Sequence, residues 1–167
     1  LSASVACFVP KPHTPFQFTA QNSLEEFSRK QTEALRPSVD RHVKLSYHGA
    51  ELSVLEGAFA RGDRRLNNVI ISAYKKGCIF DSWADFFDYG LWQEAFAENG
   101  LSIEQFACRS FEYDDDLPWD FIDTGVNKEF LISEAQKAKE AATTPNCFQK
   151  CSSCGINKKY GRCSFEI

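Results

Sequence analysis

Three prolines within six residues, Pro10, Pro12 and Pro15, place a rigid, non-helical loop near the start of the chain. Each proline fixes its own φ angle and pushes the residue before it toward extended geometry. The preceding residues, 2–9, are rich in small and β-branched side chains, which predicts a buried strand that stops at Pro10. We therefore expect a strand followed, over residues 10–17, by a loop of fixed shape.

Helical and strand periodicity follow this loop in turn. Ser23 and Glu26 have the spacing of a capping box, and apolar residues then recur at helical spacing until Pro37. Residues 41–48 alternate between apolar and polar side chains. This alternation predicts a half-exposed strand.

Two more helices are expected between residues 53 and 77. Ser53 and Glu56 repeat the capping-box spacing, and Gly62 is suited to end that helix. Asp63 is a candidate cap for the next helix, which Gly77 ends. Its apolar stripe consists of Leu66, Val69, Ile70, Ala73 and Tyr74.

The aromatic stretch 78–100 predicts two short helices separated at Gly90. Ser102 and Gln105 predict a further capped turn, and residues 127–142 predict a helix. Phe130, Leu131 and Ala135 are expected on the inner face of that helix, and all three tryptophans, Trp83, Trp92 and Trp119, are expected in the core.

Charge and hydropathy exclude several classes of protein. Residues 78–124 contain twelve Asp or Glu and one Arg, a local charge of −11, while the remaining residues sum to +7 within the net charge of −4. Such an acidic segment disfavours nucleic-acid binding. No apolar run approaches the roughly 18 residues of a membrane span, so no membrane partner is expected. The chain starts at Leu1 and contains no methionine, so we expect a fragment.

Four of the seven cysteines, Cys147, Cys151, Cys154 and Cys163, lie within the last 21 residues. Clustered cysteines without a signal peptide favour a reducing compartment, here the cytoplasm, and a metal rather than a disulfide framework. Thiolates suit both iron–sulfur clusters and zinc, so an auxiliary cluster, a zinc knuckle and the absence of a metal all stay open. Cys163 is the candidate fourth ligand.

Five segments, in this order along the chain, resemble an uncharacterised family of radical S-adenosylmethionine (SAM) proteins that carry a cobalamin-binding domain. The tail 147–155 is similar to that family too, although the family has a further cysteine at the position of Asn157. The five segments are 8–17, 53–65, 80–83, 117–120 and 125–131.

The resemblance implies a helix-rich α+β fragment: the end of a partial (β/α) barrel over 1–48, a helical extension over 49–142 and a cysteine-rich, metal-binding tail over 143–167. The catalytic 4Fe–4S cluster, the SAM site and the cobalamin-binding domain would belong to missing N-terminal domains, the expected partners of this fragment. The tail has the spacing of the catalytic cysteines, but only 13 residues follow Cys154, too few to build a SAM site.

The full-length protein would cleave SAM and start radical chemistry on an unknown substrate, and this fragment alone is expected to be inactive. The alternative is a non-enzymatic binding module, in which the acidic helical middle docks a partner and the tail forms a structural zinc knuckle. An upstream Cys-x3-Cys-x2-Cys motif would favour the enzyme.

His13, Thr14 and Gln17 are the active-site candidates because they follow the end of a strand, which is the active-site face of a (β/α) barrel. Alternatively, the prolines only shape the loop and His13 bonds to the backbone. Anion-binding candidates are Arg61, Arg64 and Arg65. The alternative for these arginines is that Asp63 caps a helix while they pair with acidic residues.

Overall fold

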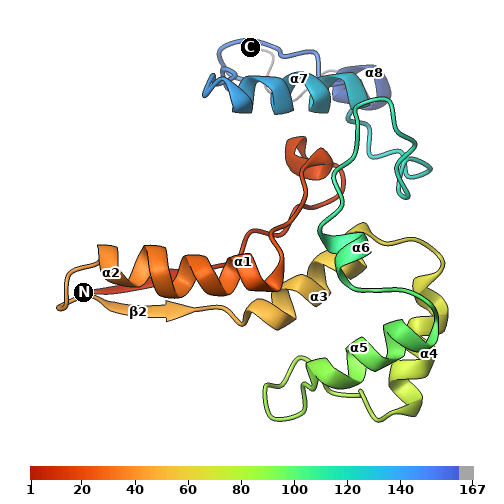
Figure 1. The fold of residues 1–167 in the computed structure, drawn as a ribbon. Coiled ribbons are helices and arrows are strands. Elements are labelled where there is room, and N and C mark those ends of the chain that lie inside the picture. Colours follow the sequence, from red (N-terminus) through yellow and green to blue (C-terminus); the bar gives the residue numbers. More distant parts are fainter. Residues whose placement is uncertain (162–167) are drawn as a thin grey trace. The chain divides into compact units, whose positions relative to one another are not determined.

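The computed structural model describes residues 1–161, which divide into two units (Figure 1). Unit 1 consists of Leu1–Pro10 and Thr19–Ser110, and unit 2 consists of Lys11–Phe18 and the chain from Phe111 onward. The proline-rich loop therefore belongs to unit 2, although its neighbours in sequence belong to unit 1. The division expected from sequence, at residues 48 and 142, stays a prediction.

Unit 1 contains a parallel pair of strands, β1 (Ser2–Val5) and β2 (Lys44–Tyr47), with Ser2 opposite Lys44 and Val5 opposite Tyr47. Both predicted strands are present but shorter than expected, and the prediction that the first is buried is wrong, because β1 contains no buried residue. The pair ends because His48 donates the last backbone hydrogen bond, to Val5, and Gly49 then starts a helix. Exposed and partly buried residues alternate along both strands.

A helical segment precedes β2 and consists of α1 (Leu24–Arg29), the π-helical turn η2 (Lys30–Leu35) and α2 (Arg36–Ser38) (Figure 1). The predicted cap is confirmed, because Ser23 Oγ accepts a hydrogen bond from the Glu26 N–H at 3.2 Å. The helix buries Phe27.

Four further helices surround the apolar core of unit 1. They are α3 (Ala50–Arg61), α4 (Leu66–Lys75), α5 (Tyr89–Glu98) and α6 (Glu104–Ala107). Helix α3 packs against α6, and α4 packs against α5. The most deeply buried side chains of this core are Val54, Ala58, Val69, Ala73, Ala95, Phe96 and Ala107.

The predicted cap at Ser53 is wrong, because α3 begins one turn earlier, at Ala50, with Gly49 as its N-cap. Ser53 lies inside the helix, and its hydroxyl donates to the Gly49 carbonyl at 2.9 Å. The earlier start adds a turn to a helix that buries Val54 and Leu55, so tertiary packing outweighs a local capping signal. The predicted cap at Ser102 is confirmed, with reciprocal hydrogen bonds between Ser102 and Gln105.

The predicted helix break at Gly90 is also wrong, because α5 runs through Gly90 and starts where Asp88 caps the N–H of Leu91. The stretch before Asp88 forms turns rather than a helix. Trp92 and Trp119 are buried as expected, whereas Trp83, which lies in those turns, is 66% exposed.

Unit 2 consists of the 3-10 turn η1 (Pro15–Phe18), helix α7 (Lys128–Lys139), helix α8 (Ile156–Tyr160) and the loops between them. Asn127 caps α7 by accepting a hydrogen bond from the Phe130 N–H at 2.7 Å. As predicted, α7 buries Leu131 and Ala135, while Phe130 lies at the edge. The core of unit 2 is formed by Phe18, Phe111, Leu117, Trp119, Leu131 and Ala135.

The helix-rich α+β class predicted from the sequence is confirmed by these elements. Two strands alone do not establish a barrel, so that interpretation belongs with the proposed function below. Within residues 1–161, none of the helices combines the length and the apolar character needed to cross a membrane.

Gly57 provides a test of this packing. A Cβ at position 57 would collide with Gln21, which is 3% exposed and donates from Nε2 to the Ser53 carbonyl at 2.8 Å. We expect Gly57→Ala to lower the free energy of unfolding, although the same change in an unobstructed helix raises it by about 0.5–1 kcal/mol. In a Gln21→Ala background, Gly57→Ala should become stabilising. Urea denaturation of the four proteins of this cycle tests the idea, and a stabilising Gly57→Ala in the wild type would contradict it.

Candidate functional site

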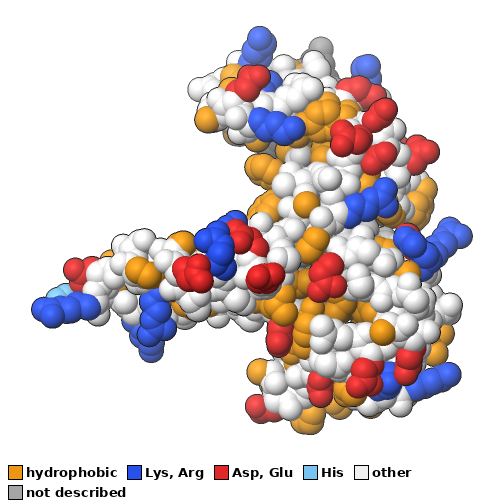
Figure 2. All heavy atoms as spheres, viewed as in Figure 1, with side chains coloured by type: hydrophobic (Ala, Val, Ile, Leu, Met, Phe, Trp, Pro, Cys, Tyr) orange, Lys and Arg blue, Asp and Glu red, His pale blue; other side chains and the backbone are white. Residues whose placement is uncertain are grey.

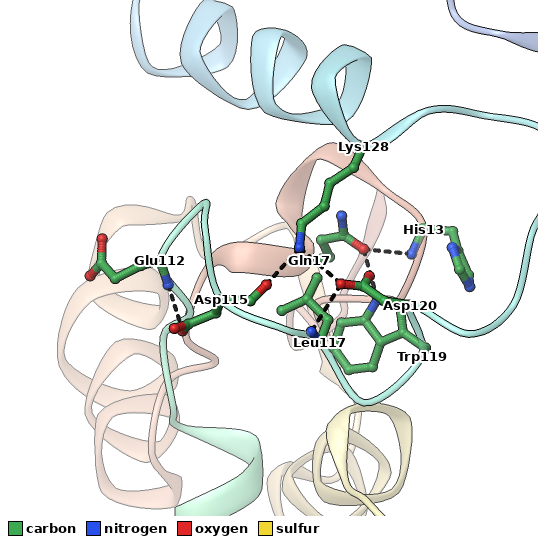
Figure 3. A network of polar contacts seen from close by, with 8 residues as sticks. All are labelled: His13, Gln17, Glu112, Asp115, Leu117, Trp119, Asp120 and Lys128. Atoms are coloured by element: carbon green, nitrogen blue, oxygen red, sulfur yellow. Dashed lines mark hydrogen bonds and ion pairs between the residues drawn. The ribbon is translucent and has the colours of Figure 1, made fainter.

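His13 and Gln17, two of the residues singled out from the sequence, line a cavity of about 330 Å³ in unit 2. Asp120 and Lys128 contribute polar groups to the same cavity (Figure 3). The rest of its lining consists of Asp123 and the apolar residues Ile122, Val126 and Leu131. A cavity of this size, with a few polar groups beside an apolar wall, is typical of a small-molecule site.

Gln17 fixes the shape of the loop that carries His13. Its side chain is 2% exposed, and Oε1 accepts hydrogen bonds from the backbone N–H of His13 at 2.9 Å and from the indole N–H of Trp119 at 2.8 Å (Figure 3). Because a buried amide oxygen needs hydrogen-bond donors, these two contacts join the loop to a segment about a hundred residues away in sequence. The loop is therefore held from inside unit 2.

His13 has an unusual backbone conformation, with φ at +57°. This left-handed region is unfavourable for a residue with a Cβ, and side chains held there often serve a function. The imidazole Nε2 is buried and has no hydrogen-bond partner among residues 1–161. Because buried polar atoms are normally paired, this nitrogen marks a position where a bound molecule would gain a hydrogen bond.

Asp120 and Lys128 form an ion pair at the cavity, with 2.8 Å between Lys128 Nζ and Asp120 Oδ2. Lys128 also donates to the Asp115 carbonyl at 2.6 Å, and the Leu117 N–H donates to Asp120 at 3.0 Å (Figure 3). Burial alone would raise the pKa of Asp120, but the hydrogen bonds from Lys128 and Leu117 and the charges of Lys128 and His13 outweigh it. The pKa of Asp120 is therefore lowered from its ordinary value.

The polar groups of the cavity thus differ in what they offer a ligand. Asp120 is ionised at neutral pH and accepts hydrogen bonds, while Lys128 is a donor that the ion pair holds in position. The ring nitrogen of His13 is the group whose hydrogen bonding is incomplete within the described chain. Such an arrangement is able to bind and orient a small polar molecule.

One wall of the cavity also anchors the cysteine tail. Asn127 donates from its backbone N–H to the Cys154 carbonyl at 2.9 Å and from its amide to the Ser153 carbonyl at 3.3 Å. Lys159 pairs with Asp123, with 2.6 Å between Nζ and Oδ2. Residues 123–128 therefore contact the tail while Asp123, Val126 and Lys128 line the cavity.

Three of the four predicted metal ligands, Cys147, Cys151 and Cys154, lie in the described tail as free thiols. Cys163 lies outside the described residues. In the part of the chain that the structure describes, no group of three His, Cys, Asp or Glu side chains is arranged to hold a metal ion. Asn157, where the resembled family has a cysteine, places its amide nitrogen 3.5 Å from Cys151 Sγ. The metal site stays a prediction.

The three candidate anion-binding arginines differ in their surroundings. Arg61 is 1% exposed and donates to the Arg109 carbonyl; burial, together with the charge of Arg109, lowers its pKa to about 10, so it stays protonated at neutral pH. Arg65 pairs with Asp63 at 2.7 Å, and its guanidinium lies 5.0 Å from the centre of the Phe106 ring. An anion contact at these arginines stays a prediction.

Arg64, unlike Arg61 and Arg65, lines a second cavity. It is exposed and lines a cavity of about 580 Å³ beside the start of α4, together with the apolar residues Phe59, Leu66 and Ile70. This cavity contains no second cation, because Gly62, Asp63 and Asn67 complete its lining. The cavity therefore favours an apolar contact over recognition of an anion.

Sequence reasoning found one part of the unit 2 cavity and missed the other. His13 and Gln17 line it, whereas the hydroxyl of Thr14 donates to the Lys11 carbonyl at 2.7 Å. Asp120 and Lys128 were missed. The available signal was their position inside 117–120 and 125–131, two of the segments that carry the family resemblance.

Comparison with known proteins adds no assignment to these residues. No family model, no curated protein and no solved structure matches this chain. The resemblance of its five segments to radical SAM proteins therefore stays a prediction.

The lowered pKa of Asp120 predicts a pH dependence of stability. A carboxyl with a lowered pKa in the folded state stabilises the fold above its unfolded-state pKa, about 3.9, and loses that contribution as the pH falls through its folded-state value. We expect Asp120→Asn to destabilise by up to about 1 kcal/mol near neutral pH, the usual limit for a solvent-screened pair. The difference from wild type should shrink as the pH falls through the folded-state pKa of Asp120, which lies below the ordinary value.

Urea denaturation at neutral pH and in acid measures the difference in the free energy of unfolding between wild type and Asp120→Asn. Asp114→Asn is the matched control, because Asp114 is an exposed aspartate of the same loop. A destabilisation by Asp120→Asn that is equally large in acid would show that the ion pair is not its source.

Proposed function

We propose that this chain is the C-terminal part of a radical SAM enzyme of the cobalamin-binding type, and that the His13 loop belongs to its active-site face. The observation that carries the proposal is the parallel pairing of β1 and β2, between which a helix lies in sequence, with the His13 loop following β1. Parallel strands connected through helices build (β/α) barrels, and the loops after the strands form their active sites.

The edges of this strand pair support the same proposal. Each strand has one neighbour within the described chain, so each leaves one edge without a partner strand there. Parallel sheets are normally larger and covered on both faces, and an isolated two-stranded pair is marginally stable in water. Further strands from N-terminal domains would complete the sheet.

In this proposal the residues of unit 2 bind and orient a substrate. His13 offers its buried Nε2, Asp120 offers a carboxylate, and Lys128 holds that carboxylate in place. When bound, SAM and the 4Fe–4S cluster would supply the radical chemistry, and in this proposal N-terminal domains would hold that cluster. The tail cysteines as described do not converge on a metal, so no step is assigned to them.

The proposal predicts where SAM cleavage takes place. After anaerobic reconstitution with iron and sulfide, this chain alone should form no 5′-deoxyadenosine above a control without protein, whereas the full-length protein should form it. Product is measured by chromatography with mass detection. Cleavage by this chain alone, or an upstream reading frame without a Cys-x3-Cys-x2-Cys motif, would contradict the proposal, and the second result would favour the binding module.

A new cysteine in the tail is expected to raise its affinity for zinc or iron. Because the Asn157 amide nitrogen lies 3.5 Å from Cys151 Sγ, a thiol at position 157 would place a second potential metal ligand beside Cys151. We expect Asn157→Cys to raise zinc or iron occupancy and resistance to chelators, and Cys163→Ser to lower both if Cys163 is the native fourth ligand. Ser110→Cys, which adds an exposed thiol in unit 1, is the control. Equal occupancy in Asn157→Cys and wild type would contradict a metal centred on Cys151.

A further inference from the structure

A row of large apolar side chains between residues 70 and 86 is exposed on unit 1. Its most exposed member is Trp83, at 66%. We call residues 79–86, which connect α4 to α5, the aromatic loop. The exposed apolar side chains are Ile70, Ile71 and Tyr74 on α4, and Ile79, Phe80, Trp83 and Phe86 in the aromatic loop. Exposed apolar groups concentrated in this way usually mark an interaction surface.

The aromatic loop is held in a defined conformation. The N–H of Trp83 donates to the Phe80 carbonyl, and the N–H of Phe86 donates to the Trp83 carbonyl, both at 2.9 Å. The rings of Phe80 and Phe86 contact each other edge to face, with centroids 5.9 Å apart. The indole N–H of Trp92 donates to Asp81 at 3.1 Å, which ties the loop to α5. A partner would therefore meet aromatic side chains that are already ordered, which lowers the entropy cost of binding.

Helix α4 carries more apolar surface than the core of unit 1 covers. The sequence predicts a stripe that includes Ile70 and Tyr74, yet the core buries only Leu66, Val69 and Ala73 of this helix. The remaining members of the stripe face solvent. A helix with such a wide apolar stripe is typical of one that packs on two sides.

The charges around the aromatic loop indicate what kind of partner fits. Asp81 and Asp85 lie within it and Asp88 follows it, and no Lys or Arg occurs in the sequence between Lys76 and Arg109. The exposed cation on the α4 side is Lys75, which follows Tyr74. Lys76 is already bound to two glutamates of α5, at 2.9 and 2.8 Å. None of the three aspartates forms an ion pair within residues 1–161. Hydrophobic and acidic side chains both reach the surface of this part of unit 1 (Figure 2).

We propose that the aromatic loop and the exposed face of α4 form a docking surface for a basic, amphipathic segment of a partner polypeptide. The apolar side chains of the segment would cover Phe80, Trp83 and Phe86, and its Lys or Arg side chains would neutralise the aspartates. Aromatic anchors supply most of the affinity of such contacts, and charge complementarity selects the partner and accelerates association. This surface belongs to unit 1 and is independent of the proposed radical chemistry.

The tryptophans make the surface directly testable. Trp83 is the exposed one of the three, since Trp92 and Trp119 are 7% and 5% exposed. The probe is a short synthetic helical peptide with Leu on one face and Lys on the other, and the matched peptide has Glu in place of Lys. We expect the Lys peptide to shift the tryptophan emission to shorter wavelength and to protect it from iodide quenching. Binding should weaken as salt is added.

Variants of exposed residues separate this surface from general attraction to an acidic protein. We expect Trp83→Ala to weaken binding of the Lys peptide about tenfold or more, and Asp85→Asn to weaken it by up to about fivefold, as measured by calorimetry. Phe121→Ala, which removes an exposed aromatic ring from unit 2, is the control and should leave binding unchanged. Unchanged unfolding midpoints confirm that the variants are folded.

Three results would overturn the proposal. Equal affinity for the Glu and Lys peptides would show that charge does not select the partner. Unchanged affinity in Trp83→Ala would show that the peptide does not bind at the aromatic loop. A shift of the Trp83 emission with protein concentration alone, accompanied by dimers in analytical ultracentrifugation, would identify a second copy of the chain as the occupant. The proposal is supported if the Lys peptide binds more tightly than the Glu peptide. This preference should be lost in Trp83→Ala and retained in Phe121→Ala.

Discussion

Unit 2 depends on the buried side-chain amide of Gln17. Its oxygen accepts one hydrogen bond from the backbone of His13 and one from the indole of Trp119. Loss of this acceptor would leave two buried N–H groups without a partner, at a cost of about 1–3 kcal/mol each. A backbone hydrogen bond from Phe111 to the Phe18 carbonyl, at 2.9 Å, lies beside it. Together these contacts join the proline-rich loop to the later chain and hold the unfavourable φ of His13.

A second constraint is the close approach of two glycines between the cavity wall and the tail. Gly125 and Gly155 have φ angles of +87° and +107°, and a Cβ on Gly155 would lie 2.8 Å from the Gly125 carbonyl oxygen. Only glycine combines this conformation with this contact. The approach lets Asn127 reach the Cys154 carbonyl while it caps α7. A change in the cysteine tail would therefore act directly on residues that line the cavity.

The sequence predicts features that depend on a few neighbouring residues. Ser23 and Ser102 cap their helices as expected, because a cap needs only a side chain and an N–H three residues later. Ser53 has the same spacing, but the core extends its helix by a turn. The exposure of Trp83 was equally unpredictable, since it depends on where α5 begins. In the site, His13 and Gln17 follow from the loop itself, whereas Asp120 reaches them only through the fold.

The acidic block of residues 78–124 separates in the structure into carboxylates that are paired and carboxylates that are not. In unit 2, Asp120 and Asp123 pair with Lys128 and Lys159, which lie after the block in sequence. In unit 1, Lys76 binds Glu94 and Glu98, and the three aspartates around the aromatic loop stay outside any ion pair of the described chain. The summed charge of a sequence segment is therefore larger than the unpaired charge that a partner would contact at the surface. Within the described residues, unpaired carboxylates also remain in unit 2, at Glu112, Asp114, Asp115 and Asp116, so charge alone does not single out the aromatic loop. What distinguishes the aromatic loop is that its unpaired aspartates lie next in sequence to the exposed rings of Phe80, Trp83 and Phe86, which is why we propose it as the docking surface.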